Sequence, residues 1–309
     1  MSLPFLQPYF GLSNSLQTAQ ASAGGGASPT RGVFGGGSTG SYTNVMDYIT
    51  IATTGNATDF GDLTVSRAYF AGCNSSTRGI FAGGYTGASS NVIDYITIAT
   101  TGNAIDFGDL TVARYEGAGV NSDTRGVVGG GTSSNVMDYI TIATTGNAID
   151  FGDLLSVTSS MGGVNTTTRG IYGGGGGAIN VIQYITIATT GNATDFGDLT
   201  VARGVYGAGI NSDVRGIFAG GYTGAISNVI DYITMATLGN ATDFGDLIAS
   251  KYDGGTANSL TRGTYAGGAG TTSYLSPIEY ITIATTGNAT SFGNLSVGRE
   301  GMPGVQNGL

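Results

Sequence analysis

The sequence predicts an all-β protein in which six copies of one unit close into a β-propeller with four-stranded antiparallel blades. Three sequence markers recur six times each, at intervals of about 46 residues. The first is the arginine of a Thr-Arg-Gly segment (Val-Arg-Gly in the fifth copy), at Arg31, Arg78, Arg125, Arg169, Arg215 and Arg262. The second is the tyrosine of Tyr-Ile-Thr, at Tyr48, Tyr95, Tyr139, Tyr184, Tyr232 and Tyr280. The third is the phenylalanine of Phe-Gly-Asp/Asn-Leu, at Phe60, Phe107, Phe151, Phe196, Phe244 and Phe292.

The composition supports strands and turns rather than helices, collagen or a disordered linker. Of the 309 residues, 57 are glycine and only 10% are charged. The glycines have no three-residue period, which excludes a collagen-like triple helix. The 17 tyrosines and 12 phenylalanines recur with Ile and Val at fixed intervals, and a disordered chain lacks that much apolar material. No apolar run is long enough to predict a transmembrane helix.

Each unit divides into four extended segments separated by polar turns. The first is glycine-rich and variable, as in 115–120, and the second is an apolar run that ends in Gly-Gly, as in 79–84. The third, as in 91–99, is rich in Ile and Val, and the fourth, as in 105–110, contains the Phe-Gly-Asp-Leu marker. β-Branched and aromatic residues fill the segments and Gly, Asn, Asp, Ser and Thr fill the gaps, which is typical of strands joined by turns.

The third segment predicts sheets that are covered on both faces. Val92, Ile96 and Ile98 point to one side of such a strand, and Ile93 and Tyr95 point to the other, so both sides are largely apolar. Radial stacking places each blade of a propeller between two neighbours and covers both faces. Glycine suits the innermost strands, because strands near the axis leave little room for side chains. The alternative fold is a trimeric β-solenoid or fibre.

The units resemble kelch repeats. A kelch unit has an apolar run that ends in Gly-Gly, a tyrosine in the next strand, a large aromatic residue in the fourth strand and a basic residue before the next unit. The matching residues here are 80–84, Tyr95, Phe107 and Arg114, and phenylalanine stands where kelch units usually have tryptophan. The resemblance covers roughly residues 20–299. It implies that the loop after Gly-Gly and the loop after Phe-Gly-Asp-Leu open at the same end of the ring.

A second resemblance concerns the exact amino-acid sequence of the repeat. The phrase Ile-Ala-Thr-Thr-Gly-Asn-Ala-Thr-Asp-Phe-Gly-Asp-Leu, at 51–63, looks like repeat proteins encoded by tailed phages, particularly marine ones. The resemblance implies a virion protein, assembled in the host cytoplasm. The first residues of the chain contain no basic residue and no long apolar stretch, so we expect no signal peptide.

The repeat count leaves one terminal copy of the first segment unused. That segment occurs seven times, the first at about 20–26 and the last at about 300–305, whereas a ring of six needs six innermost strands. Pro303 cannot donate a hydrogen bond within a strand, which favours the N-terminal copy as the closing strand over the C-terminal one. We therefore expect an N-terminal arm at 1–19, the propeller at 20–299, and a surplus strand or tail at 300–309.

Composition removes most catalytic chemistry. The chain has no histidine and a single cysteine, Cys73, so it has no Ser-His-Asp or Cys-His pair, no imidazole metal site and no internal disulfide. The net charge of −9, with only eleven cations, argues against a nucleic-acid partner. Repeated aspartate pairs such as Asp106 and Asp109 do not match a calcium loop. We expect no cofactor, no metal and no enzymatic activity.

A basic residue follows Phe-Gly-Asp-Leu in five units. These cations are Arg67, Arg114, Arg203, Lys251 and Arg299, and Thr158 occupies the position in the remaining unit. A ring of cations at that end would bind an acidic sugar or another carboxylate. The alternative, which we favour, is that each pairs with the aspartate five residues earlier, such as Asp62 before Arg67. The arginine of the Thr-Arg-Gly turn, at the opposite end, is expected to bond turn carbonyls or neighbouring carboxylates.

The loop after Gly-Gly differs in length and composition between units, and variable loops on a rigid scaffold commonly carry recognition. Four loop tyrosines are candidate contacts for a host-surface sugar or protein: Tyr42, Tyr85, Tyr222 and Tyr274. The alternative is that the loops vary without consequence.

The N-terminal arm contains an apolar patch outside the repeat. Its candidate anchor residues are Leu3, Phe5, Leu6, Tyr9 and Phe10. Such a segment is too short to fold alone and would order on binding another virion protein, or would pack on the propeller itself or fray.

These observations predict a non-enzymatic structural or attachment protein of a phage virion. The arm would fasten the propeller to the particle, and loops at one end would bind a partner or the host surface. Two alternatives are a carbohydrate-active enzyme, which requires a non-repeated pair of carboxylates, and a soluble scaffold that binds one protein.

Overall fold

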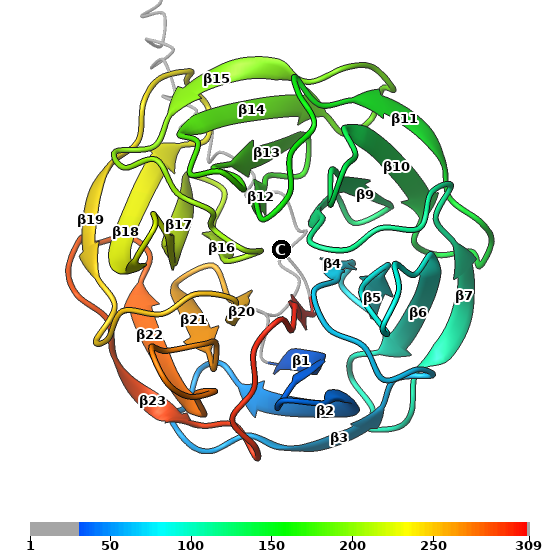
Figure 1. The fold of residues 1–309 in the computed structure, drawn as a ribbon, viewed down its shortest axis with the longest axis horizontal. Coiled ribbons are helices and arrows are strands. Elements are labelled where there is room, and N and C mark those ends of the chain that lie inside the picture. The colour runs from blue at the N-terminus through cyan, green and yellow to red at the C-terminus, as the bar shows by residue number, and fades with distance from the viewer. Residues whose placement is uncertain (1–30, 308–309) are drawn as a thin grey trace, which may run out of the picture.

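A computed structural model describes residues 31–307, and over this range the chain is a six-bladed β-propeller, as predicted (Figure 1). Six antiparallel sheets of four strands each surround a central axis. Residues 31–307 contain no helix long and apolar enough to cross a membrane. The expected arm at 1–19, with its anchor residues, and the first copy at 20–26 lie outside the described residues.

The strands take four positions from the axis to the rim (Figure 1). The innermost strands are β4 (Ala71–Asn74), β8 (Ala118–Asn121), β12 (Gly162–Asn165), β16 (Gly209–Asn211), β20 (Gly255–Asn258) and β24 (Gly304–Gln306). The second strands are β1 (Arg31–Ser38), β5 (Arg78–Ala82), β9 (Arg125–Gly129), β13 (Arg169–Gly173), β17 (Arg215–Tyr222) and β21 (Arg262–Ala266). The third strands are β2 (Tyr42–Thr50), β6 (Val92–Thr97), β10 (Val136–Thr141), β14 (Val181–Thr186), β18 (Ile226–Thr234) and β22 (Pro277–Thr282). The outermost strands are β3 (Thr58–Asp62), β7 (Ile105–Asp109), β11 (Ile149–Asp153), β15 (Thr194–Asp198), β19 (Thr242–Asp246) and β23 (Thr290–Asn294).

The C-terminal strand closes the ring. The first blade has the order β24-β1-β2-β3, with Val305 opposite Val33, so the expectation that the N-terminal copy supplies the innermost strand is wrong. The argument from Pro303 fails because this proline precedes β24 instead of lying within it. Its missing N–H therefore removes no ladder bond, and its carbonyl still accepts a hydrogen bond from Gly35 N–H at 3.3 Å.

The hydrophobic core lies between blades rather than within them. One cluster combines Ile80 and Phe107 of the second blade with Ile140 and Ile142 of the third, and all four side chains are buried. Burying such a side chain contributes roughly 1.5–3 kcal/mol relative to leaving it in water. Because each sheet buries its apolar faces against its neighbours, a single unit cannot cover its own core.

The most repeated phrase of the sequence joins neighbouring blades at the rim. The turn after β6 lies against β3 of the preceding blade: Gly102 N–H donates to Phe60 O at 2.7 Å, and Asn103 Oδ1 accepts from Asp62 N–H at 3.1 Å. Gly61 is left-handed, at φ +138°, and a Cβ there would lie 2.5 Å from Gly102 O. The same contact recurs around the ring, which explains why Thr-Gly-Asn and Phe-Gly-Asp recur together.

The arginines of the Thr-Arg-Gly turn also join blades, in the local role that we predicted. Arg78 stacks over Tyr95 of its own blade, with its guanidinium carbon 4.6 Å from the ring centroid. Its Nη1 donates to Ile142 O of the next blade at 2.9 Å. All six turn arginines repeat both contacts, so they stabilise the ring at the end opposite the Gly-Gly loops.

Candidate functional site

The cations that follow Phe-Gly-Asp-Leu are buried structural groups, so the structure does not present them as a binding ring. Each side chain is at most 2% exposed. The partner that we expected, the aspartate five residues earlier, is also wrong. Each cation pairs instead with an acid in the third strand of the next blade, at 2.6–3.1 Å. The pairs are Arg67–Asp94, Arg114–Asp138, Arg203–Asp231, Lys251–Glu279 and Arg299–Asp47.

The acid of each pair also binds the turn that carries the cation. Asp94 accepts hydrogen bonds from the backbone and the hydroxyl of Thr64, at 3.2 and 2.5 Å. In the one unit where Thr158 replaces the cation, Gln183 replaces the acid. Its side-chain Oε1 accepts a hydrogen bond from Leu155 N–H at 2.8 Å. Burial lowers the pKa of Lys251, and Glu279 partly offsets that effect. The pairs therefore join blades and leave no charge at the surface.

A central channel follows the axis between the six innermost strands. It encloses about 740 Å³ of space not filled by atoms, including its opening to solvent. At one end a ring of amides lines it: Asn74, Asn121, Asn165, Asn211, Asn258 and Gln306. At mid-height the wall is mostly glycine, since a Cβ on Gly119 or Gly209 would lie 2.1 or 1.9 Å from the carbonyl oxygen of the preceding blade's glycine. Neighbouring innermost strands therefore lie too close together at these positions to admit a side chain.

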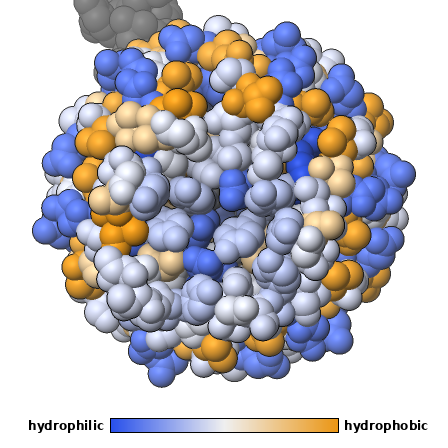
Figure 2. All heavy atoms as spheres, in the orientation of Figure 1, coloured by the Kyte–Doolittle hydropathy of each residue, from blue (hydrophilic) through white to orange (hydrophobic). Residues whose placement is uncertain are grey.

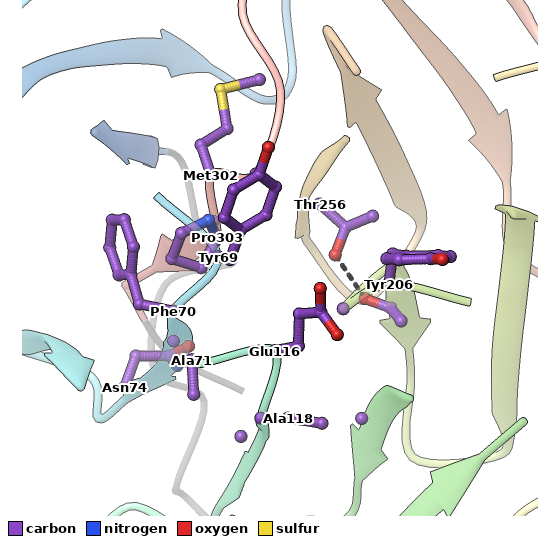
Figure 3. Close-up of a pocket in the computed structure, with 18 of the residues that line it drawn as sticks. Tyr69, Phe70, Ala71, Asn74, Glu116, Ala118, Tyr206, Thr256, Met302 and Pro303 are labelled. Atoms are coloured by element: carbon purple, nitrogen blue, oxygen red, sulfur yellow. Dashed lines mark hydrogen bonds between the residues drawn. The ribbon is translucent and has the colours of Figure 1, made fainter. Parts of the chain in front are cut away.

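At the other end, six equivalent residues form what we call the collar. They are Tyr69, Glu116, Ser160, Tyr206, Asp253 and Gly301, and all line the channel. Each lies in the link between the outermost strand of one blade and the innermost strand of the next, and these links cross in front of the blades in Figure 1. Figure 3 shows the Glu116 carboxylate projecting into the space between Tyr69 and Tyr206. Figure 2 shows weakly polar residues around the central opening and mixed hydrophobic and hydrophilic residues along the rim.

The collar backbone is left-handed in every blade. The φ angles lie between +55° and +66°, although only Gly301 is a glycine. Five members donate their N–H to the C=O of the preceding member, at 2.6–2.9 Å; Glu116 N–H, for example, donates to Tyr69 O. A non-glycine residue in this conformation costs roughly 1–3 kcal/mol, and such residues cluster at functional sites. The geometry thus directs five side chains of four kinds into the mouth of a symmetric ring.

Three carboxylates gather at this mouth: Glu116, Asp253 and the neighbouring Glu300. Glu116 Oε2 accepts from the hydroxyls of Ser159 and Ser160, at 2.9 and 3.0 Å. Glu300 Oε1 accepts from the Tyr69 hydroxyl at 2.7 Å. Asp253 is 7% exposed, and its carboxylate has no hydrogen-bond or ion-pair partner within residues 31–307.

Burial and nearby carboxylates raise the pKa values of three groups at the mouth, Asp253, Tyr206 and Tyr69. Burial, then the charges of Glu300 and Glu116, raise the pKa of Asp253 well above its ordinary value. Burial, then the charges of Asp253 and Glu116, raise the pKa of Tyr206 to about 12. Burial and the bond to Glu300 raise the pKa of Tyr69. The mouth is thus an acidic, partly desolvated site.

The four loop tyrosines lie at the same end as the collar but do not form one cluster. Tyr42 packs edge-on against Tyr85 at 5.7 Å, and Tyr85 in turn contacts Tyr115. Tyr222 lies on the other side of the ring, with its ring centroid 5.8 Å from that of Tyr252. Tyr252 in turn packs on the collar residue Tyr206, with the ring centroids 5.3 Å apart. Tyr42, Tyr222 and Tyr274 are each about two-fifths exposed, whereas Tyr85 is half-buried. The Tyr206–Tyr252–Tyr222 row connects the channel mouth to a loop.

Sequence reasoning missed the collar, although a signal was present. The collar lies in the variable first segment of the repeat, and its position, two or three residues after the cation, changes residue type in every blade except for its two tyrosines. Within residues 31–307 no three Asp, Glu, Cys or His side chains are close enough to hold one metal ion. Cys73 is buried, and burial raises the pKa of its thiol to about 12, so it is a packing residue.

No protein-family model matches the chain, and no curated protein matches it in sequence.

Proposed function

We propose that this protein is a non-enzymatic binding propeller whose collar end recognises a partner. The observation that supports the proposal most directly is the collar, where six equivalent backbone positions carry five residue types on an otherwise repeated scaffold. A repeated scaffold does not require different residues at equivalent strained positions, whereas a surface that recognises a partner requires them. The exposed Tyr42 and Tyr222 extend this surface outward, and tyrosine suits contacts with proteins and sugars.

We further propose a phage virion as the setting, with the N-terminal segment as the attachment to the particle. Arg31, where the described chain begins, belongs to the end of the ring opposite the collar. The kelch-like order of the repeat and its phage-like wording support this setting, and many copies on one particle would strengthen weak contacts through avidity.

Two variants test the two halves of this proposal. Virions assembled in the presence of a protein that lacks residues 1–19 should not incorporate that protein. Quantitative immunoblotting of purified virions measures the incorporation. Particles with Tyr42→Ser and Tyr222→Ser should incorporate the protein normally but adsorb to host cells more slowly. Full incorporation of the truncated chain, or unchanged adsorption of the tyrosine variant, would contradict the corresponding half.

A second candidate function, a carbohydrate-active enzyme, is favoured by one observation. The mouth carries a non-repeated carboxylate cluster, and the pKa of Asp253 is raised in the direction that a general acid requires. This reading expects purified protein to release reducing sugars from a panel of bacterial surface polysaccharides, and Asp253→Asn to abolish the release. No release from any polysaccharide favours the binding function.

A further inference from the structure

The negative charges of the mouth have no cationic partner within residues 31–307. All eleven Lys and Arg residues lie within 31–307, and each has a partner elsewhere. Six turn arginines donate to carbonyls at the opposite end, and five buried cations pair with acids between blades. Glu116 and Asp253, which line the channel, and Glu300, which accepts from the Tyr69 hydroxyl, therefore have no Lys or Arg partner within residues 31–307.

Asp253 makes this imbalance costly. It lines the channel, is more than nine-tenths buried, and has no hydrogen-bond or ion-pair partner among the described residues. A buried carboxylate must either take up a proton or find a compensating charge. A cationic group that enters the mouth would provide that charge and would also approach Glu116, which lines the same channel.

The arrangement favours an organic cation over a metal ion. The three carboxylates belong to three different links of the ring, and within residues 31–307 no three such groups are close enough to ligate one metal. Tyr69 and Tyr206 supply aromatic rings at the same mouth, and Tyr252 packs against Tyr206. Aromatic faces attract ammonium groups.

We propose that the collar binds a primary alkylammonium group, as found at the end of a lysine side chain or of a linear polyamine. The ammonium would enter the mouth between Tyr69 and Tyr206 and be neutralised by Glu116 and Asp253. The proposal rests on the proposed function in placing recognition at the collar end, and it adds the chemical class of the ligand.

Isothermal titration of the purified full chain tests the proposal with three probes: spermidine, a lysine-containing tripeptide with blocked ends, and a neutral oligosaccharide. We expect binding of at least one amine and none of the sugar. Binding of spermidine alone identifies a free polyamine as the source, and binding of the tripeptide identifies a lysine side chain. Binding of the sugar alone, or of no probe, would overturn the proposal.

Isosteric variants locate the site. Glu116→Gln should weaken amine binding about ten-fold, because it removes a charge next to the bound ammonium. The control Asp106→Asn removes an exposed charge at the rim and should leave the affinity unchanged. Equal weakening by both variants would mean diffuse attraction rather than a site, and would refute the proposal.

A further variant tests the aromatic contribution, and a separate measurement verifies folding. Tyr206→Leu keeps every charge and should also weaken amine binding several-fold, while thermal unfolding by circular dichroism verifies that each variant is folded. Undiminished amine affinity in folded Glu116→Gln and Tyr206→Leu proteins would place the ligand elsewhere. Virion incorporation and host adsorption test the proposed function and are measured separately from amine binding. A chain that binds no amine would refute only the ligand proposed here, and unchanged adsorption would refute only the proposed function.

Discussion

At the scale of single residues, the buried ion pairs show how the sequence encodes contacts between blades. The cation after Phe-Gly-Asp-Leu and the acid in the next blade change together. Where the cation is lysine, Lys251, its partner is glutamate, Glu279. Where the neutral Thr158 occupies the cation position, the neutral Gln183 occupies the acid position. An unpaired charge in this position would be buried and uncompensated, which explains why the two positions change together.

Exchange of one pair for the natural neutral pair tests this account. Arg114→Thr leaves Asp138 buried without its cation and should lower the free energy of unfolding by about 3–5 kcal/mol. Adding Asp138→Gln reproduces the Thr158–Gln183 arrangement and should recover most of that loss. Urea unfolding of the wild type, both single variants and the double variant measures the coupling. A double variant no more stable than Arg114→Thr would contradict the account.

Asp253 gives a prediction with a definite dependence on pH. Its pKa in the folded protein is raised above the ordinary value of 3.8, so between those two pKa values the folded state binds more protons than the unfolded state. Its stabilising contribution is therefore fully present below the unfolded pKa and is lost as the pH rises through the folded pKa. Glu116, Glu300 and the nearby tyrosines Tyr69, Tyr206, Tyr252 and Tyr265 are the titratable groups around it.

The variant Asp253→Asn should remove this dependence. Relative to the wild type, its free energy of unfolding should be similar near pH 4 and should increase above that by at most about 1.4 kcal/mol per pH unit. Urea unfolding over roughly pH 4 to 8 measures the difference, with the exposed Asp106→Asn as the control. A difference that stays constant with pH would show that Asp253 does not titrate in this way.

At the scale of elements, the innermost strands show why glycine is required at particular positions. Gly209 approaches the carbonyl oxygen of Gly163 so closely that a Cβ would lie 1.9 Å away. The equivalent position in β20 is Thr256, whose hydroxyl donates to Gly209 O at 2.7 Å. A side chain is therefore accepted only where it forms a hydrogen bond with the neighbouring strand.

Gly209→Ala should consequently destabilise the propeller by about 1–3 kcal/mol, because the methyl group displaces β16 from β12. Gly55→Ala is the matched control, since a Cβ at Gly55 has no atom within 4 Å. Thermal unfolding of both variants provides the comparison. Similar melting temperatures for the two variants would mean that the innermost strands separate without cost.

At the scale of the whole molecule, stability depends on closure of the ring by β24. Val305 is fully buried and pairs with Val33 in β1, and Gln306 completes the ring of amides. Without β24, blade one would lose its innermost strand and expose the edge of β1 to solvent.

Two truncations separate the possible closing strands. Deletion of 303–309 should lower the melting temperature markedly and broaden the transition, because it opens the ring. Deletion of 1–30, which contains the other copy of the segment, should leave the melting temperature of the propeller unchanged. The reverse outcome, with the N-terminal deletion destabilising and the C-terminal one neutral, would assign closure to the N-terminal copy.

The resemblance to kelch repeats predicted that two sets of loops open at the same end of the ring. The sequence by itself determined the repeat, the number of blades and the four strands in each blade. These features follow from local periodicity, since Tyr95, Phe107 and Arg78 recur at fixed spacing and strand and turn chemistry is local. Only the tertiary structure decided which terminus closes the ring, that Arg67 pairs with Asp94 rather than Asp62, and that Glu116 and Asp253 line one channel mouth. The physical reason is that these contacts join segments between 27 and about 270 residues apart, and only the closed ring brings them within reach of one another.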